Sequence, residues 1–309
     1  MKLYRELADL PAEFRGGAVT IGNFDGVHQG HARIIERLQA AAMKISGPSV
    51  VFTFDPHPVR LLRPQNAPPP LTWTDRKAEL LGLMNVDAMI AYPTDEALLQ
   101  LTPVEFFDRI VRDRLDARAI VEGPNFSFGR DRAGNVNVLR DLATAAGIDV
   151  EIVEPLILDG EVVSSSRVRR LIADGQITEA GKLLTRPYRI RGMVVHGAGR
   201  GNKIGFPTAN VDAIDTLLPK IGVYAGAVQI AGQLFAAAIN IGPNPTFGEQ
   251  SIKVEVHVIH WNGPLYGRVL EVDFLARLRD IQRFDGVDML KQQLQLDVEA
   301  ALQVLANHS

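Results

Sequence analysis

A chain of 309 residues with 46% hydrophobic residues is long enough for about two domains and too apolar for a disordered protein. Its formal net charge of −3 gives no overall basic field for nucleic acid or an anionic membrane, so we expect neither as a partner. The sequence contains no cysteine, which excludes thiolate chemistry. It also has no apolar signal core and no run of roughly 18 apolar residues, so we expect a cytoplasmic protein.

Short apolar stretches alternate with helical patterns through the first half of the chain. Residues 18–22 predict a buried strand, and residues 50–54 predict a second one. A helical pattern lies between them, with these apolar residues on one face: Ile34, Ile35, Leu38 and Ala42. Further strand-like or helix-like stretches occupy 80–83, 89–91, 119–122 and 150–153. This alternation predicts a Rossmann-like α/β domain with parallel strands and crossover helices. The proline-rich stretch 63–70 predicts an irregular loop, which we expect to act as a mobile flap.

The pattern changes near Arg186-Pro187, and we place a domain boundary after residue 184. Short alternating runs follow, punctuated by glycine and proline, at 188–195, 222–230, 234–241, 253–259 and 269–274. They predict an antiparallel barrel or sandwich. A closing helix is predicted over 287–305, because Leu290, Leu294, Val298 and Leu305 recur at helical spacing.

A glycine-rich segment joins the first strand to the first helix, with the sequence Gly22-Asn23-Phe24-Asp25-Gly26-Val27-His28-Gln29-Gly30-His31. His28 and His31 are three residues apart, so both imidazoles can lie on one side of the first helical turn. Gly30 would let a phosphate approach the backbone, and the helix N-terminus would add N–H donors. Such donors would hold charge on an α-phosphate under attack. The alternative is a glycine-rich turn with two incidental histidines.

A serine run precedes a later helical pattern, with the sequence Val163-Ser164-Ser165-Ser166-Arg167-Val168-Arg169. Alone, this run predicts nothing more than helix N-capping. Paired with the histidine segment, it predicts the other half of a triphosphate clamp, with Arg169 as a cationic arm.

Together the two segments resemble the adenylyltransferase superfamily, where threonine usually stands in place of Ser166. The segment Asn125-Phe126-Ser127-Phe128-Gly129 narrows the resemblance to the bacterial FAD synthetases. The resemblance implies that His28 and His31 are catalytic. It also implies that these residues bind ATP and its phosphates: Gly22, Asn23, Asp25, Gly30, Asn125, Ser164, Ser165, Ser166 and Arg169. Phe54 and Phe128 are candidates to face an isoalloxazine ring, with core packing as the alternative for each. The role of His57, between two prolines, stays open.

A second glycine-rich segment runs Gly199-Arg200-Gly201-Asn202-Lys203-Ile204-Gly205-Phe206-Pro207-Thr208-Ala209-Asn210. The loop framed by Gly199, Gly201 and Gly205 can bend its N–H groups around phosphates, and Lys203 adds positive charge. Thr208 and Asn210 are two residues apart, so they share a face if the segment is extended. Their hard, neutral oxygens suit Mg²⁺ bound to ATP phosphates. A simple turn is the alternative, and it is favoured by these residues taken singly.

Glu255 lies on the polar side of the strand Ile252-Lys253-Val254-Glu255-Val256-His257-Val258. Such a charge is usually just solvated. In a small barrel that side can point inward toward a ligand, which would make Glu255 a general-base candidate.

The second half resembles the riboflavin kinase family. The matching stretches are Gly199–Asn210, Gly222-Val223-Tyr224, Asn240-Ile241-Gly242, Pro245-Thr246-Phe247, Val254-Glu255-Val256-His257 and Leu265-Tyr266-Gly267. The resemblance implies that Thr208 and Asn210 hold magnesium and ATP, and that Glu255 is the catalytic base. The family's acidic pair after this strand is replaced here by His260-Trp261-Asn262, a change we expect to affect surface charge more than catalysis.

The two resemblances together imply a bifunctional enzyme of flavin cofactor biosynthesis, with FMN adenylyltransferase in 1–184 and riboflavin kinase in 185–309. Riboflavin would be phosphorylated to FMN with ATP and Mg²⁺, and FMN would then be adenylylated to FAD with release of pyrophosphate. No zinc is implied, because the histidines lack further ligands at metal spacing. We expect small-molecule substrates and a monomer or weak homo-oligomer. The alternatives are a different phosphorylated vitamin as acceptor, a flavin-binding regulator without catalysis, and a nucleic-acid-binding protein.

Overall fold

The computed structural model describes residues 1–197, 199–243 and 252–308. The chain forms two compact units, which are Met1–Pro68 with Thr72–Ser164 and Pro69–Leu71 with Ser165–Ser309. Helices α7 (Ser165–Ala173) and α8 (Ile177–Leu184) therefore group with the second unit. The boundary after residue 184 stays a prediction about where the two functional domains meet. No helix among the described residues is long and apolar enough to span a membrane.

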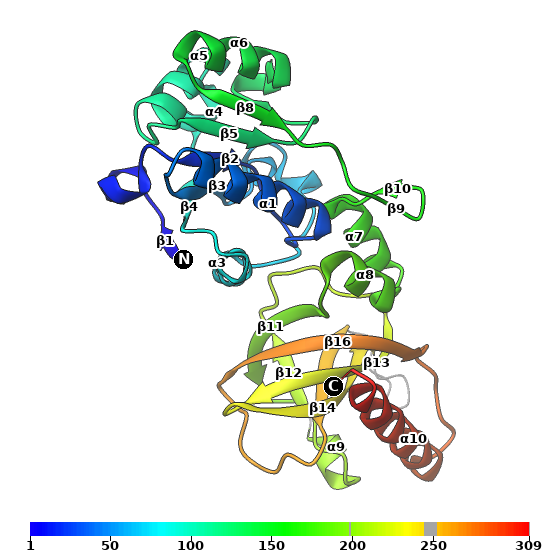
Figure 1. The fold of residues 1–309 in the computed structure, drawn as a ribbon. Helices are drawn as coiled ribbons and strands as arrows, with labels where there is room; N and C mark the ends of the chain where they lie inside the picture. Colours follow the sequence, from blue (N-terminus) through cyan, green and yellow to red (C-terminus); the bar gives the residue numbers. More distant parts are fainter. Residues whose placement is uncertain (198, 244–251, 309) are drawn as a thin grey trace. The chain divides into compact units, whose positions relative to one another are not determined.

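The first unit is built on a parallel sheet of six strands (Figure 1). Across the sheet the strands follow the order β1 (Lys2–Tyr4), β4 (Ala88–Pro93), β3 (Ser49–Asp55), β2 (Ala18–Ile21), β5 (Ala119–Glu122) and β8 (Asp149–Ile152). The predicted parallel sheet is confirmed. The chain moves from β2 through β3 to β4 on one side and then returns to β5 on the other. Crevices at the carboxyl ends of strands that flank such a reversal are where α/β sheets bind ligands.

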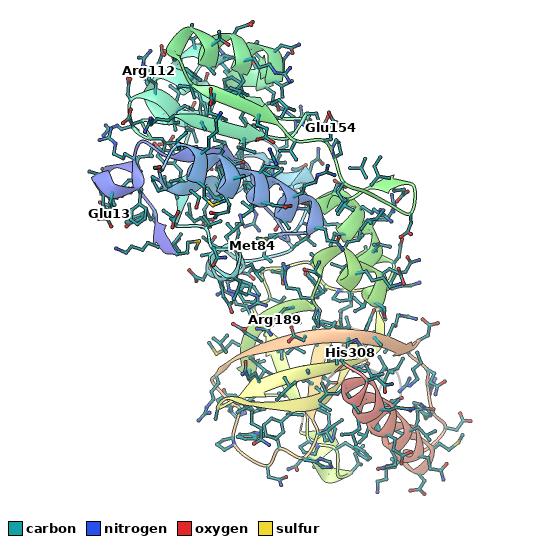
Figure 2. All side chains as sticks on the ribbon, viewed as in Figure 1. Glu13, Met84, Arg112, Glu154, Arg189 and His308 are labelled. Atoms are coloured by element: carbon teal, nitrogen blue, oxygen red, sulfur yellow. The ribbon has the colours of Figure 1, made fainter. Side chains whose placement is uncertain are left out.

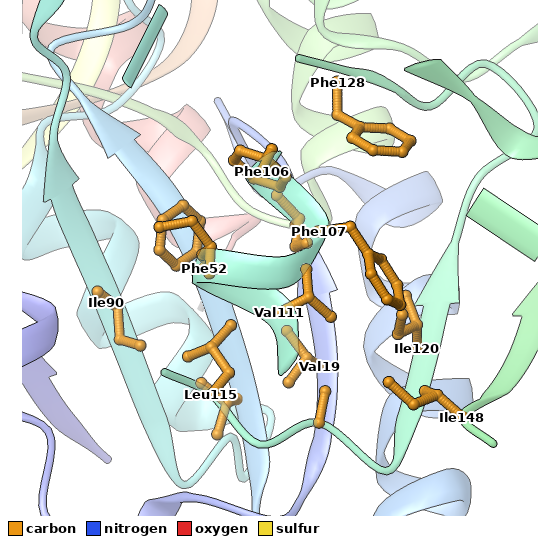
Figure 3. Close-up of a cluster of buried hydrophobic side chains, with 14 of the residues drawn as sticks. Val19, Phe52, Ile90, Phe106, Phe107, Val111, Leu115, Ile120, Phe128 and Ile148 are labelled. Atoms are coloured by element: carbon orange, nitrogen blue, oxygen red, sulfur yellow. The ribbon is translucent and has the colours of Figure 1, made fainter. Parts of the chain in front are cut away.

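Apolar side chains cover both faces of this sheet, because successive strand residues point to opposite sides. One cluster contains Val19, Phe52 and Ile120, packed with aromatic residues that include Phe106 and Phe107 (Figure 3). The other cluster contains Val51 and Met89 together with apolar residues of the flanking helices. The sheet is thus buried on both sides, as a parallel sheet requires.

Helices connect the strands of the first unit. They are α1 (Gln29–Lys44), α2 (Val59–Leu62), α3 (Thr74–Leu83), α4 (Glu96–Gln100), α5 (Pro103–Phe106), a π-helical turn (Phe107–Arg112) and α6 (Val136–Ala146). Two small hairpins complete the unit, formed by β6 (Ser127–Phe128) with β7 (Gly134–Asn135) and by β9 (Ile157–Leu158) with β10 (Glu161–Val162). In α1 the apolar positions Ile35, Leu38 and Ala42 are buried, as their spacing predicts.

The proline-rich stretch 63–70 is less irregular than predicted. It contains a short 3₁₀ helix at Pro64–Asn66, and Pro69 and Pro70 belong to the second unit. The carbonyl of Pro69 accepts a hydrogen bond from Nε of Arg169, and that of Pro70 accepts one from the backbone N–H of Leu217. These two prolines are therefore anchored, and the flap stays a prediction for the rest of the stretch.

The second unit is a closed antiparallel barrel, one of the two architectures predicted. Around the barrel the strands follow the order β11 (Tyr188–Val195), β12 (Ala209–Asp212), β15 (Lys253–Val258), β14 (Gln233–Gly242), β13 (Gly222–Ile230) and β16 (Val269–Arg279). Large buried side chains such as Tyr224 and Phe274 fill the interior, where their rings meet edge to face. Figure 2 labels Arg189, which lies on β11. Its guanidinium donates two hydrogen bonds of 2.7 Å to Asp273 on β16.

Two helices accompany the barrel strands, α9 (Arg200–Lys203) and α10 (Val287–Ala306). Helix α10 packs on the outside of β13, β14 and β16, where Ala301 meets Ala225 and Ala236. Ala225 is paired directly with Ala238, so side chains in register with these alanines also lie on the outer wall. This assignment decides where Glu255 points.

Candidate active sites

The β2–α1 connection places the two predicted histidines at the start of α1. Nδ1 of His28 accepts a hydrogen bond of 3.3 Å from the backbone N–H of His31, so His28 is the N-cap of the helix. The two rings stack at 3.7 Å with 14° between their planes. The prediction that both imidazoles share one side of the first turn is confirmed. Because Nδ1 of His28 accepts this hydrogen bond, that nitrogen carries no proton.

The loop before the histidines is fixed by buried polar contacts. Oδ1 of Asp25 accepts hydrogen bonds from the backbone N–H and the hydroxyl of Thr72, at 3.1 and 3.3 Å. The hydroxyl oxygen of Thr72 also accepts from the N–H of Gly26 at 3.1 Å. Asp25 therefore has a structural role in the loop, and its predicted ATP contact stays a prediction. Oδ1 of Asn23 is buried and accepts no hydrogen bond from the described residues, so a ligand donor would satisfy it.

Close packing favours glycine at position 30, a reason that the sequence did not suggest. A Cβ at this position would lie 3.0 Å from the carbonyl oxygen of Val163 and 3.1 Å from the His28 ring. Glycine thus lets the helix start pack closely against the segment that leads into the serine run. The phosphate approach proposed for Gly30 stays a prediction.

The serine run is divided between the two units. Ser164 ends the first unit, directly after Val163, whereas Ser165, Ser166 and Arg169 lie on α7 in the second unit. The apolar residues Val168 and Ile172 on α7 are buried. The triphosphate clamp that would combine these residues with the histidines stays a prediction.

Glu122 is a buried residue at this site that the sequence analysis missed. The ladder between β2 and β5 pairs only Ala18 with Ala119 and Val19 with Ile120. Beyond it, Oε1 of Glu122 accepts a hydrogen bond of 2.5 Å from the backbone N–H of Ile21. Burial raises the pKa of Glu122 well above its ordinary value, although its backbone donors at Ile21 and Gly123 oppose this. The Glu122 carboxylate thus pairs with the backbone of β2 beyond the last residues at which β2 and β5 are hydrogen-bonded to each other.

Lys77 on α3 is the second buried charged residue that was missed. It is 7% exposed, and its Nζ donates to the hydroxyl oxygen of Thr53 at the carboxyl end of β3, at 3.3 Å. The sequence gives no local signal for either residue, because Glu122 ends an apolar run and Lys77 lies among the charged residues Asp75, Arg76 and Glu79.

The predicted flavin contacts lie in different environments. Phe128 is 6% exposed and packs with Phe106 in the core (Figure 3). Phe54 is half-buried at the carboxyl end of β3, edge-on to Phe52. Asn125 is exposed in the loop after β5. Of the two aromatic candidates, Phe54 is the more accessible to a ligand, and both assignments stay predictions.

His57 lies in the turn before α2, where its Nδ1 accepts a hydrogen bond of 3.1 Å from the backbone N–H of Val59. This contact gives the ring a role in shaping the turn.

The second unit contains an open pocket on the outer wall of the barrel, with about 1090 Å³ of empty space that includes its opening to solvent. Most of the predicted kinase residues line it, including Gly199, Gly201, Thr208, Asn210 and Glu255. Two predicted phosphate-binding residues, Lys203 and Gly205, are exposed and do not line the pocket. Their roles stay predictions. The matched stretch Pro245-Thr246-Phe247 lies outside the described residues.

Three strands bring the polar side chains of this pocket together. Asn210 on β12 is directly opposite Glu255 on β15, which is directly opposite Asn240 on β14. Nδ2 of Asn240 donates to Oε2 of Glu255 at 3.4 Å. Asn240 was quoted in the sequence analysis only as part of a matching stretch. Its signal was a polar residue between the buried Ile239 and Ile241.

The expectation that Glu255 points inward is wrong. Glu255 is in register with Asn240, and so lies on the same outer wall as Ala238, whereas Val254, Val256 and Val258 are buried. A barrel of six strands is narrow, and apolar side chains fill its interior. The ligand space is therefore outside the barrel, where α9 and α10 help to enclose it.

The Thr208 edge is shaped by close backbone packing. A Cβ at Gly201 would lie 2.3 Å from the carbonyl oxygen of Phe206 and 3.4 Å from the Thr208 hydroxyl oxygen. A Cβ at Gly197, which the sequence analysis missed, would lie 2.0 Å from Nδ2 of Asn210. His257 adds a third constraint, because its Nδ1 lies 2.7 Å from the carbonyl oxygen of Pro207 and donates to it. These contacts fix the segment that carries Thr208 and Asn210.

The donors present fit a magnesium ion shared with ATP. Thr208, directly before β12, and Asn210 on β12 offer two neutral oxygens that line the same pocket. Among the described residues, no group of three or more histidine, aspartate or glutamate side chains could hold a metal by itself. A hard cation here would therefore depend on ligands from the substrate.

The pocket also has apolar side chains and a buried ion pair in its lining. Ile281, Phe284 and Leu294 are among the apolar ones. Arg279 on β16 donates to both carboxylate oxygens of Asp297 on α10, at 2.9 and 2.6 Å. Asp297 is 3% exposed, so the pair fixes α10 against the barrel from a buried position.

Comparisons with known proteins match both halves of the chain. A family model described as FAD synthetase matches residues 10–167, and one described as riboflavin kinase matches residues 184–305. The protein named bifunctional riboflavin kinase/FMN adenylyltransferase from Pseudomonas fluorescens is 39% identical over 97% of each chain. The protein of that name from Escherichia coli (strain K12) is 35% identical over 96% of each chain.

A solved structure with similarity to the whole chain is named macrolide-efflux protein, from Streptococcus pneumoniae. It is 33% identical, covers 97% of each chain and has a TM-score of 0.86. The full-length relatives and the two family models name the same pair of activities. The chain belongs to the bifunctional riboflavin kinase/FMN adenylyltransferase family.

Proposed function

We propose that each of the enzyme's two activities has its own catalytic centre, with riboflavin phosphorylation at the barrel pocket and FMN adenylylation at the β2–α1 loop. The register that joins Asn210, Glu255 and Asn240 across three strands beside Thr208 is the observation that carries this assignment. A merely flavin-binding protein would need no carboxylate at that place. The acidic balance and lack of a basic stripe disfavour nucleic acid as a substrate.

In the kinase reaction, Glu255 would accept the proton of the ribityl 5′-hydroxyl as this oxygen attacks the γ-phosphate of ATP. Asn240 supports this role, because its amide donates to Oε2 and orients the carboxylate. The loop with Gly199 and Gly201 would contact the phosphates, and the apolar lining residues of the pocket would contact the flavin ring. A positioned base of this kind contributes about 10²–10⁴-fold in rate.

Magnesium would be held by Thr208 and Asn210 together with the phosphates of ATP. When bound there, it would neutralise charge that develops on the phosphate oxygens. The residues of this chain would hold the phosphate chain in line with the hydroxyl, which is the main requirement of phosphoryl transfer.

In the adenylylation reaction, the phosphate of FMN would attack the α-phosphate of a second ATP, and pyrophosphate would leave. His28 and His31 would stabilise the charge at the α-phosphate, together with the N-terminus of α1. The buried Oδ1 of Asn23 would accept a hydrogen bond from the ribose or the adenine. Ser164, Ser165, Ser166 and Arg169 would bind the leaving phosphates, and Asn125 would contact the nucleotide.

Two variants test this division when flavins are separated by chromatography. Glu255→Gln should fail to convert riboflavin to FMN but still convert supplied FMN to FAD. His31→Ala should convert riboflavin to FMN, which should then accumulate. Loss of both activities from either variant in a folded protein would contradict the assignment. Cytoplasmic location and a monomeric or weakly oligomeric state stay predictions of the sequence.

A further inference from the structure

A buried lysine supports the loop assigned above to nucleotide binding. Lys77 is 7% exposed, although an ammonium group loses favourable hydration when it is buried. Its Nζ lies 3.3 Å from the hydroxyl oxygen of Thr53, which is itself fully buried. Burial lowers the pKa of Lys77, and the carboxylates of Asp25 and Asp55 act against that shift. Because burial of the ammonium group costs hydration free energy, we infer that the charge of Lys77 has a role that a neutral side chain could not perform.

The contact chain from Lys77 ends at the backbone of the β2–α1 loop. The Thr53 hydroxyl donates to the carbonyl oxygen of Asn23 at 3.2 Å. Because this hydroxyl has one hydrogen, it accepts from Lys77 with a lone pair. Lys77 therefore fixes the direction of the hydroxyl and, through it, the peptide that follows Asn23. Asp25, two residues further on, contributes the negative charge that faces the ammonium group.

This loop needs external support, because its backbone is strained. Phe24 and Val27 have φ angles of +47° and +41°, in the left-handed region that side chains rarely adopt. Both residues are buried, at 3% exposure. The strain falls between the strand end and the histidines, and the ring of Phe24 lies 5.0 Å from that of His31. Strain held at such a place indicates a conformation needed for function.

We propose that Lys77 is a positioning residue for adenylyl transfer, acting through Thr53 to hold the β2–α1 loop in the shape that presents Asn23, His28 and His31 to ATP. This inference rests on the adenylylation site assigned under the proposed function. Lys77 does not itself contact the nucleotide. Its effect is transmitted by one hydroxyl to one backbone carbonyl.

The test measures both reactions in full-length variants. Lys77→Met keeps the length of the side chain and removes its charge, and Thr53→Val keeps the shape and removes the hydroxyl. We expect each to lower kcat/KM for ATP in FMN adenylylation about 10²-fold, while riboflavin phosphorylation stays within about twofold of wild type. In the double variant the losses should not multiply, because both changes break one chain of contacts. Thr53→Ser keeps the hydroxyl and should restore most of what Thr53→Val loses.

A core variant separates positioning from general destabilisation. Leu139→Ala opens a cavity at α6, away from the loop, and should lower the melting temperature without changing kcat/KM for adenylylation. If Lys77→Met and Thr53→Val behave like Leu139→Ala, the proposal is overturned. If Lys77→Met does not fold, Thr53→Val and Thr53→Ser decide it by the same criterion. Unchanged adenylylation in His31→Ala would instead refute the site itself, so the two failures are distinguishable.

Discussion

Replacement of Gly201 by alanine tests whether the Thr208 edge of the barrel pocket is positioned by close packing. A Cβ at Gly201 would lie 2.3 Å from the carbonyl oxygen of Phe206, and real Cβ contacts essentially never fall below 3.0 Å. The obstacle is backbone, so the Phe206 peptide would have to move by about 0.7 Å. Thr208 follows two residues later and would move with it. Alanine is also the better helix former, so intrinsic propensity would not weaken α9.

A displacement approaching 1 Å can cost about 10²-fold in rate, so we expect kcat/KM for riboflavin phosphorylation to fall between about tenfold and about 10²-fold. The assay is FMN formation from riboflavin and Mg-ATP, with FAD formation from supplied FMN as the internal reference. Gly286→Ala is the matched control in the same unit, because a Cβ there meets no atom within 4 Å. Equal kinase rates for Gly201→Ala and Gly286→Ala would refute the packing argument.

Three further predictions concern buried or half-buried polar groups. The folded-state pKa of Glu122 is raised above its ordinary 4.5, so stability present below pH 4.5 is lost as pH rises toward the folded pKa. Between pH 4.5 and the folded pKa, the free energy of unfolding of wild type should therefore fall by about 1.4 kcal/mol per pH unit relative to that of Glu122→Gln, as measured by urea denaturation. The same pH dependence of the free energy of unfolding in both proteins would contradict this. Asn240→Leu removes a donor to a carboxylate and should lower kcat of the kinase about tenfold, whereas an unchanged kcat would exclude an orienting role. Asp297→Ala leaves Arg279 without its buried partner and should cost about 3 kcal/mol in urea denaturation, and a cost below about 1 kcal/mol would show that the pair does not hold α10.

The strands and the closing helix were predictable because their signals are local. The runs predicted at 188–195 and 222–230 match β11 and β13, of which β11 alternates in burial and β13 is buried on both faces. The helix expected over 287–305 ends one residue later in the structure. The strand β1 was missed because three residues carry too little pattern. The spacing of apolar residues along the sequence was therefore enough to predict the architecture of each unit.

The sites were only partly predictable, because they depend on strand pairing. Asn210 and Glu255 were identified as candidates from separate motifs, but their position opposite each other follows from the register between β12 and β15. The face of Glu255 was misjudged because alternation distinguishes two faces without saying which one lies inside a closed barrel. Lys77 and Glu122 have no local pattern, since each is recognisable only by the backbone and side chains that surround it after folding.

The most direct test of two separate catalytic centres is complementation between two inactive chains. Glu255→Gln and His31→Ala proteins are each given riboflavin, ATP and Mg²⁺, first alone and then mixed, and FAD is quantified by chromatography. Neither variant alone should produce FAD, and the mixture should produce it, because FMN released by one chain is adenylylated by the other. A mixture that yields no FAD, although each variant keeps its remaining activity, would contradict the account.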